Sequence, residues 1–163
     1  MTDYIVNLLT GADLGAYFVT LIVSMIPVIE LRGAIPLGVG LGLSHFDAMW
    51  VSVLGNMLPV PFIILFIRPI FKWMTQRSER LGRLVTRLEA KAEGKWEQVH
   101  KYQFFGLAIF VGIPLPGTGA WTGALIAAVM GMRLRSALPS ILLGVLIAGF
   151  LVTGITYGFT SIF

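Results

Sequence analysis

Apolar residues run along this chain in four long stretches, separated by short turns and by one long polar segment. Two of the stretches, 46–67 and 136–160, are continuous, and Asp47 is the one charged residue in either of them. A helix of about 20 residues crosses the ~30 Å apolar core of a bilayer. The pattern therefore predicts one transmembrane helix in each.

The other two stretches, 14–44 and 102–132, are too long for one span and too short for two spans with a turn, which need about 40 residues. Proline and glycine interrupt both near the middle: Pro27, Gly33 and Pro36 in the first, Pro114 and Pro116 in the second. Proline removes a helical donor and glycine permits a chain reversal. We expect two re-entrant helical hairpins, each entering and leaving the membrane on one face. Long, tilted helices kinked at proline are the alternative.

Composition supports lipid as the solvent. Hydrophobic residues make up 56% of the chain and charged residues 12%, about half the charged fraction of soluble domains. The chain has no cysteine and two histidines, and no Ser-His-acid, metal-ligand or Walker spacing is present. We therefore expect an all-α integral membrane protein that is not an enzyme and holds no cofactor or metal.

The cations predict the topology. Nine of the twelve Lys and Arg residues lie in 68–101, and Arg133 and Arg135 follow the second interrupted stretch. Two re-entrant hairpins would put all eleven on the cytoplasmic side and both termini outside, as the positive-inside rule requires. Kinked single spans would separate the two groups. Residues 72–101 are predicted to form an amphipathic cytoplasmic helix that lies on the leaflet or over the helix bundle, with membrane lipids rather than nucleic acid as the partner of its cations.

The two halves also match weakly in sequence at an offset of 89 residues. The matched pairs are Pro27 with Pro116, Gly42 with Gly131, Ala48 with Ala137, Leu54 with Leu143 and Gly55 with Gly144. With opposite predicted orientations, this pattern indicates an inverted repeat, a common plan among secondary transporters. Stripes of small residues in the apolar segments favour a homo-oligomer.

Glu30 and Arg32 are the strongest functional candidates, because they are ionisable residues inside an apolar stretch. Charges at membrane depth pair, face a cavity or take part in transport. Glu30 could exchange a proton and Arg32 could bind an anion. The alternative is a structural ion pair that closes the hairpin tip. Asn56, in the first continuous span, is expected to hydrogen-bond to a neighbouring helix.

The second tip has no charge, but its backbone amides near the start of a half-helix would favour an anion. The candidate binding residues there are Gly117, Thr118, Gly119, Trp121 and Thr122. We expect this tip to face Arg32 near the bilayer middle, unless it is only a tight turn for close packing. Arg133 and Arg135 either collect an anionic head group or only satisfy the topology rule.

The segments 29–36 (IELRGAIP) and 114–123 (PLPGTGAWTG) resemble the bacterial and archaeal family named "putative small multidrug export protein" over nearly the whole chain. The plan is also similar to the DedA superfamily, which implies two opposed re-entrant hairpins and movement of lipid phosphates coupled to ion or proton gradients. In that superfamily acidic residues of the first hairpin and arginines in and after the second are functional. Glu30 fits the first position, whereas the second tip here lacks arginine and Arg32 lies in the first.

These observations predict a gradient-driven, flippase-like transporter of an anionic amphiphile, such as a polyprenyl phosphate or another lipid phosphate, in the cytoplasmic membrane of a bacterium or archaeon. Arg32 and the second tip would bind the substrate, and Glu30 would couple its movement to protons or another ion. An exporter of lipophilic cations and a non-transporting, lipid-organising membrane protein are the alternatives, with an intramembrane enzyme a distant third.

Overall fold

The structure, a computed structural model, describes residues 12–99 and 102–162, and this part of the chain forms helices and no strand. The prediction of an all-α protein is confirmed. The helices are α2 (Ala12–Ser24), α3 (Glu30–Gly40), α4 (His45–Met57), α5 (Pro59–Arg77), α6 (Glu79–Val99), α7 (Gln103–Gly112), α8 (Ala120–Val129) and α9 (Leu134–Ile162).

Two helical runs within the described residues are long and apolar enough to cross a membrane, His45–Arg77 and Leu134–Ile162. The first consists of α4 and α5 and continues ten residues past the end predicted for the span over 46–67. It continues because arginine and lysine are good helix formers and because Phe71 remains buried within it. The amphipathic helix expected from residue 72 therefore begins at Glu79, and residues 100–101 lie outside the described part.

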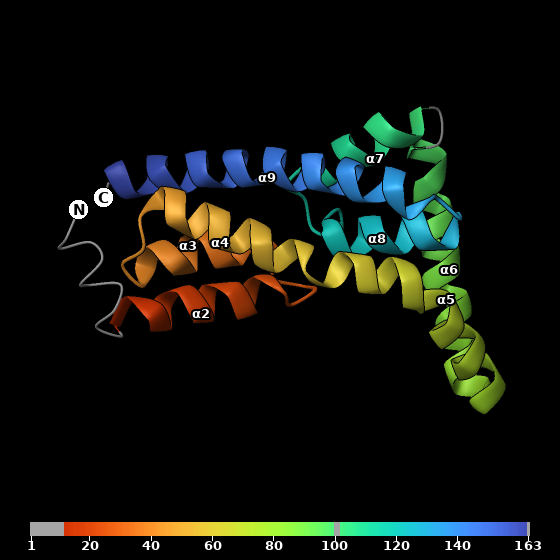
Figure 1. The fold of residues 1–163 in the computed structure, drawn as a ribbon. Coiled ribbons are helices and arrows are strands. Elements are labelled where there is room, and N and C mark those ends of the chain that lie inside the picture. Colours follow the sequence, from red (N-terminus) through yellow and green to blue (C-terminus); the bar gives the residue numbers. More distant parts are fainter. Residues whose placement is uncertain (1–11, 100–101, 163) are drawn as a thin grey trace. The chain divides into compact units, whose positions relative to one another are not determined.

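The described chain divides into two compact units (Figure 1). Unit 1 contains α2, α3, α4 and the part of α9 that begins at Leu146. Unit 2 contains α5, α6, α7, α8 and the part of α9 that ends at Val145. Each unit thus combines a pair of short helices with portions of both long helical runs.

Both interrupted stretches reverse direction at their breaks. In unit 1, a Cβ added to Gly38 of α3 would lie 2.9 Å from the Thr20 hydroxyl oxygen on α2. A continuous helix would hold these residues about 27 Å apart. In unit 2, a Cβ added to Gly123 of α8 would lie 2.5 Å from the Val111 side chain on α7. The chain therefore forms two helical hairpins, with breaks at 25–29 and 113–119.

The same local structure recurs at the offset of 89 residues. Two residues after the ends of α3 and α8 lies a glycine in the left-handed region, Gly42 (φ +99°) and Gly131 (φ +71°). The amide after each glycine donates across the helix end, from Leu43 to the Gly38 carbonyl at 3.0 Å and from Met132 to the Ala127 carbonyl at 2.8 Å. This is the hydrogen bond of a Schellman cap. The next helices, α4 and α9, begin at residues 45 and 134, again 89 apart.

Helix packing repeats at the same offset. Gly55 of α4 lies against α2, so that an added Cβ would be 2.5 Å from the Leu21 carbonyl oxygen. Gly144 of α9 lies against α7, with the Ala108 carbonyl oxygen 2.6 Å from an added Cβ. At both positions glycine permits a close approach of two backbones.

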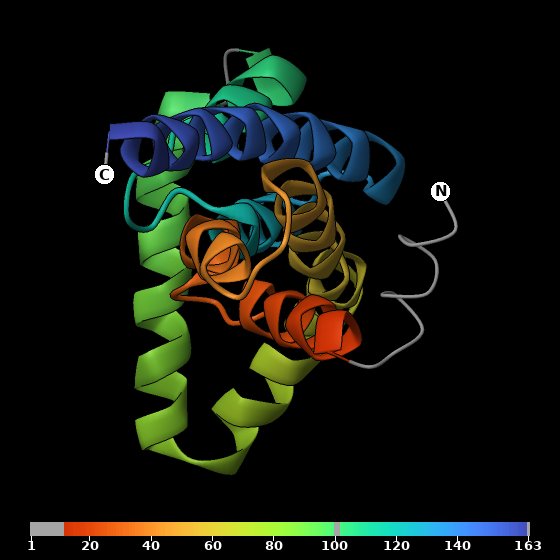
Figure 2. The same cartoon turned by 90° about the vertical axis from the view of Figure 1, so that its left-hand side faces the viewer.

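In unit 2, α5 and α6 meet at Ser78 and form a V (Figure 2). α6 also packs against α7 and α8. Val85 and Ala92, two turns apart on α6, are buried, while Leu84 and Lys91 beside them are exposed. One face of the amphipathic helix therefore covers the other helices of unit 2.

Candidate functional site

Glu30 begins α3 directly after the first break, and its backbone is unusual. The residue is 3% exposed, and its φ of +49° is the one positive value at a non-glycine position in the described chain. For a residue with a Cβ this conformation costs roughly 1–2 kcal/mol. Such outliers persist where the surroundings hold them, and they cluster at functional sites.

Arg32 pairs with this carboxylate. Its Nη1 donates to Glu30 Oε2 at 3.5 Å, and the Arg32 side chain is 20% exposed. Removing one partner of such a pair leaves a buried charge uncompensated and costs roughly 3–5 kcal/mol. The contact is long for a charge-assisted hydrogen bond. The geometry therefore joins the two charges without locking them in a short bidentate pair.

Gly33 and Pro36, which the sequence indicated as part of the break, lie inside α3 instead. The fixed φ of proline suits a helix, and its cost is one lost backbone donor and local crowding. Pro27 does lie in the break, as do Pro114 and Pro116 in the second break. The reversal in unit 1 therefore occurs over 25–29 and is complete before Gly33.

Polar side chains are buried in unit 1 where unit 2 is apolar. Ser52 and Asn56, one turn apart on α4, are 0% and 1% exposed. Their counterparts at the offset of 89, Ile141 and Val145 of α9, are both 0% exposed. Asn56 was expected to hydrogen-bond to a neighbouring helix, but neither Nδ2 nor Oδ1 has a hydrogen-bond partner, and Ser52 Oγ has none either.

A lysine of α6 contacts the second tip, although it lies outside the interrupted stretch 102–132. Lys95 of α6 donates from Nζ to the Gly117 carbonyl oxygen at 2.8 Å, and the same Nζ lies 5.3 Å from the centre of the Phe110 ring. Burial and, to a smaller extent, the charge of Lys91 lower the pKa of Lys95. Gly117 has φ +81°. The uncharged tip expected from sequence thus lies beside an ammonium group.

The other candidates of this tip form its turn and the start of α8. The Thr118 hydroxyl lies 2.6 Å from the Ile113 carbonyl oxygen and 2.8 Å from that of Leu115, so it closes the turn. Gly119 is the N-cap residue of α8 and has no side chain to cap it. Trp121 and Thr122 lie half-buried in the first helical turn. The expected contact between this tip and Arg32 would join the two units and stays a prediction.

Arg133 and Arg135 lie at the start of α9 and are exposed. Arg133 lines an open pocket of about 390 Å³ together with Gln103, Gly131, Met132 and Ser136. A small anionic group could enter such a pocket. Arg135 does not line it.

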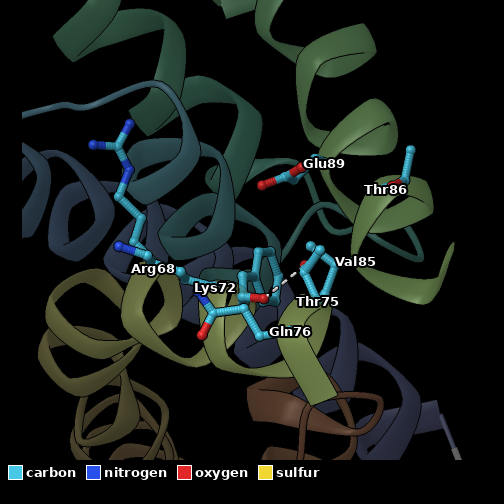
Figure 3. A pocket seen from close by; sticks show the side chains of 8 residues that line it. Arg68, Lys72, Thr75, Gln76, Val85, Thr86 and Glu89 are labelled. Atoms are coloured by element: carbon cyan, nitrogen blue, oxygen red, sulfur yellow. Dashed lines mark hydrogen bonds between the residues drawn. The ribbon is translucent and has the colours of Figure 1, made fainter. Parts of the chain in front are cut away.

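A second pocket of about 380 Å³ lies between α5 and α6 in unit 2 (Figure 3). It is lined by Arg68, Phe71, Lys72, Thr75, Gln76, Val85, Thr86 and Glu89. Arg68 Nη2 donates to the Val129 carbonyl at the end of α8, at 2.9 Å. Lining groups of both charges give this pocket no clear preference for an anion. Among the described residues no three His, Asp or Glu are grouped as metal ligands.

Lys95 is the functional candidate that sequence reasoning missed. It lies 22 residues before Gly117, within a series of basic residues that repeat at helical spacing. The pattern alone does not distinguish the one that points towards the tip from those that face water. A hydrophobic face that includes Val85 and Ala92 indicates that α6 packs on something, which is the signal that could have been followed.

Comparison with known proteins gives one match. A family model described as "Putative small multi-drug export protein" matches residues 30–151, which are 122 of the 163 residues. No curated protein and no solved structure matches the chain. The more distant similarity to the DedA superfamily stays a prediction. The match starts at Glu30, directly after the first break, and includes Arg32, the second break, the first long helical run and the second run as far as residue 151. The chain belongs to the small multi-drug export protein family.

Proposed function

We propose that this protein is a proton-coupled transporter of an anionic amphiphile with a phosphate head group, and that Glu30 and Arg32 form its coupling site. The observation that carries the proposal is the Glu30–Arg32 pair at the tip of a broken hairpin, with the Glu30 side chain 4% exposed. The family description, which names export, supports a transport role.

The helix lengths support re-entrant hairpins. The four hairpin helices have 13, 11, 10 and 10 residues. At 1.5 Å per residue they are roughly 15–20 Å long, shorter than the ~30 Å apolar core. Each of the two long runs crosses once in this arrangement, so the repeats have opposite orientations. We expect 72–101 on the cytoplasmic side of the cytoplasmic membrane.

The ion pair offers a simple coupling mechanism. With Glu30 ionised, its charge neutralises Arg32, and a phosphate must compete with a carboxylate that is already in place. A proton on Glu30 removes that competitor, and the Arg32 guanidinium then binds the phosphate, for which its donor geometry is suited. Substrate anion and proton therefore bind together, and the proton gradient drives both in the same direction.

The second tip adds a favourable potential within unit 2. Lys95 Nζ donates to the Gly117 carbonyl oxygen, and α8 begins three residues later, at Ala120, without a side-chain cap. Positive charge and a helix N-terminus both favour anions. We assign Gly119, Trp121 and Thr122 to the path of the head group, and Arg133 to its entry from the cytoplasmic side.

An exporter of lipophilic cations is the second candidate, favoured by the family description. Glu30 would then bind the cation after Arg32 moves away, and a proton would compete with the cation for the carboxylate. The two candidates predict opposite roles for Arg32, since it binds an anion in the first and repels the substrate in the second.

Proteoliposomes that contain a fluorescent short-chain polyprenyl phosphate test the proposal. We expect the wild type to speed its transfer between leaflets and to acidify the lumen measurably as it does so. Glu30→Gln should remove the dependence on the pH gradient, and Arg32→Met should abolish transfer. Arg80→Met, which removes an exposed cation from α6, is the matched control. Movement of ethidium that depends on Glu30, without any movement of the phosphate, would favour the cation exporter instead.

A further inference from the structure

Asn56 is the buried polar group that the mechanism above does not use. Its side chain is 1% exposed, and both the donor Nδ2 and the acceptor Oδ1 are buried without a hydrogen-bond partner. Buried polar atoms are almost always satisfied, and each exception needs an explanation. An amide with both atoms in this condition is matched by a ligand or side chain that both accepts and donates.

Helix geometry puts Asn56 at the level of Glu30. Gly38 of α3 meets Ala48 of α4, because a Cβ on Gly38 would lie 3.1 Å from the Ala48 Cβ. The chain reverses between these helices at 41–44, so α3 and α4 run in opposite directions. Glu30 precedes Gly38 by eight residues, and Asn56 follows Ala48 by eight.

Eight residues rise about 12 Å in a helix, so both side chains lie about 12 Å from the Gly38–Ala48 contact, on the same side of it. Figure 1 shows the α2–α3 connection and the end of α4 at one end of unit 1. Glu30 belongs to the buried face of α3 and Asn56 to the buried face of α4.

The second repeat shows that the fold does not require these groups. At the offset of 89, Asn56 corresponds to Val145, which is 0% exposed, and Glu30 corresponds to Gly119. Where the carboxylate is absent, an apolar residue replaces the amide. The amide and the carboxylate therefore occur together in unit 1, and unit 2 has neither of them at the matching positions.

A protonated carboxyl is complementary to a primary amide. Its O–H donates to the amide oxygen, and its carbonyl oxygen accepts from the amide nitrogen, so both atoms of each group are satisfied in one planar pair. An ionised carboxylate can use Nδ2 alone. We propose that Asn56 is the docking partner of protonated Glu30, so that the carboxyl group alternates between Arg32 when ionised and Asn56 when protonated.

This inference rests on the proposed function, and it adds the element that holds the proton while Arg32 binds the anion. Arg32 is the charged group beside Glu30 on α3. The other helices of unit 1 carry their charged or titratable residues elsewhere: Asp13 and Tyr17 towards the start of α2, His45 and Asp47 in the first turn of α4, and Tyr157 on α9, which contacts His45. Among the described residues of unit 1, the switch therefore uses the Glu30 carboxyl, the Arg32 guanidinium and the Asn56 amide.

The first test is the pH at which phosphate transfer in proteoliposomes reaches half its maximal rate. Asn56→Val gives unit 1 the residue of unit 2, and Asn56→Leu keeps the branching of the asparagine side chain at Cγ. Both should move the midpoint about one pH unit towards acid, a tenfold loss of proton affinity or about 1.4 kcal/mol. Val145→Asn, the reverse substitution at the matching position of unit 2, should leave the midpoint unchanged. Infrared spectra should show the band of the protonated Glu30 carboxyl at higher frequency in the Asn56 variants.

The second test needs no transport. Glu30→Gln mimics the protonated carboxyl, so Asn56→Val should weaken the fold more in the Glu30→Gln background than in the wild type at pH 8. A coupling of about tenfold in the unfolding equilibrium constant in detergent is expected. If that coupling appears but no variant or wild type moves phosphate, the docking stands and the transport proposal falls. If transport depends on Glu30 but neither the midpoint nor the coupling responds to Asn56, the docking is overturned.

Discussion

Gly55 is the position where the packing of unit 1 can be tested most directly. An alanine Cβ at this position would lie 2.5 Å from the Leu21 carbonyl oxygen and would also collide with the Ser24 hydroxyl. The hydroxyl can rotate away, whereas the carbonyl belongs to the backbone of α2. The two helices must then separate by about 0.9 Å to reach the 3.4 Å of ordinary contact.

Two opposing terms set the expected size of the effect. Overpacking of this kind costs about 1–3 kcal/mol, and alanine gains up to about 1 kcal/mol over glycine inside a helix. Gly154, in the unit 1 part of α9, has open space around its Cβ position. Gly154→Ala should therefore gain the helix propensity of alanine without any overpacking cost. We expect Gly55→Ala to be less stable than Gly154→Ala by about 1–3 kcal/mol, or about 2–4 °C of melting temperature for each kcal/mol.

Equilibrium unfolding in mixed micelles, followed by circular dichroism, measures this difference. Ser24→Ala combined with Gly55→Ala should recover only part of the loss, because it removes the hydroxyl and leaves the Leu21 carbonyl. Gly144→Ala should behave like Gly55→Ala, since it meets the Ala108 carbonyl oxygen at 2.6 Å. Equal stability of the Gly55→Ala and Gly154→Ala proteins would show that α2 and α4 do not pack at this distance.

Two further predictions concern helix ends and the linker. Ser44 caps α4 by accepting from the Asp47 amide at 3.0 Å and donating to the Asp47 carboxylate at 2.7 Å. Ser44→Ala should therefore lower the free energy of unfolding by about 1 kcal/mol. Arg133→Ala, at the equivalent position before α9, removes no cap and is the control in the same micelle assay. Because folding lowers the pKa of Lys95 from 10.5, through burial first and Lys91 second, the folded protein releases this proton before the unfolded chain does. The contribution of Lys95 to stability therefore rises as the pH increases from its folded pKa to 10.5. Lys91→Met should raise the folded pKa and narrow that interval, as carbon-13 NMR of labelled lysine can show; an unchanged Lys95 titration would mean that the two ammonium groups do not interact.

The hairpins could be predicted because their cause is local. Proline within an apolar stretch that is too short for two spans leaves few alternatives, and the reversals at 25–29 and 113–119 follow from it. The offset of 89 was visible as five residue pairs, of which Gly42 and Gly131 proved to share a helix-ending conformation. A glycine that must adopt positive φ is retained in both repeats for a physical reason.

The remaining features depend on contacts between distant segments. The bond from Lys95 to Gly117 requires the linker helix to lie along the hairpin of unit 2, which no periodicity specifies. The position of Pro36 inside α3 reflects a helix that tolerates one lost donor because its other face is buried. The sequence predicts a helix–helix hydrogen bond for Asn56, because the pattern shows that this polar residue is buried but not what its side chain faces.

The difference between the two repeats distinguishes the residues that the fold requires from the residues that the function requires. Both repeats contain the helix-ending glycines and the glycines of close helix contact, Gly55 and Gly144, so these positions serve the architecture. Glu30, Ser52 and Asn56 have apolar or glycine counterparts in unit 2, where the same packing is achieved without a polar side chain at these three positions. Burial of polar groups is costly unless they are paired, and Ser52 and Asn56 are buried without a hydrogen-bond partner, so these two residues make unit 1 less stable than apolar residues would. A cost that the second repeat avoids is accounted for if unit 1 binds a proton and a substrate.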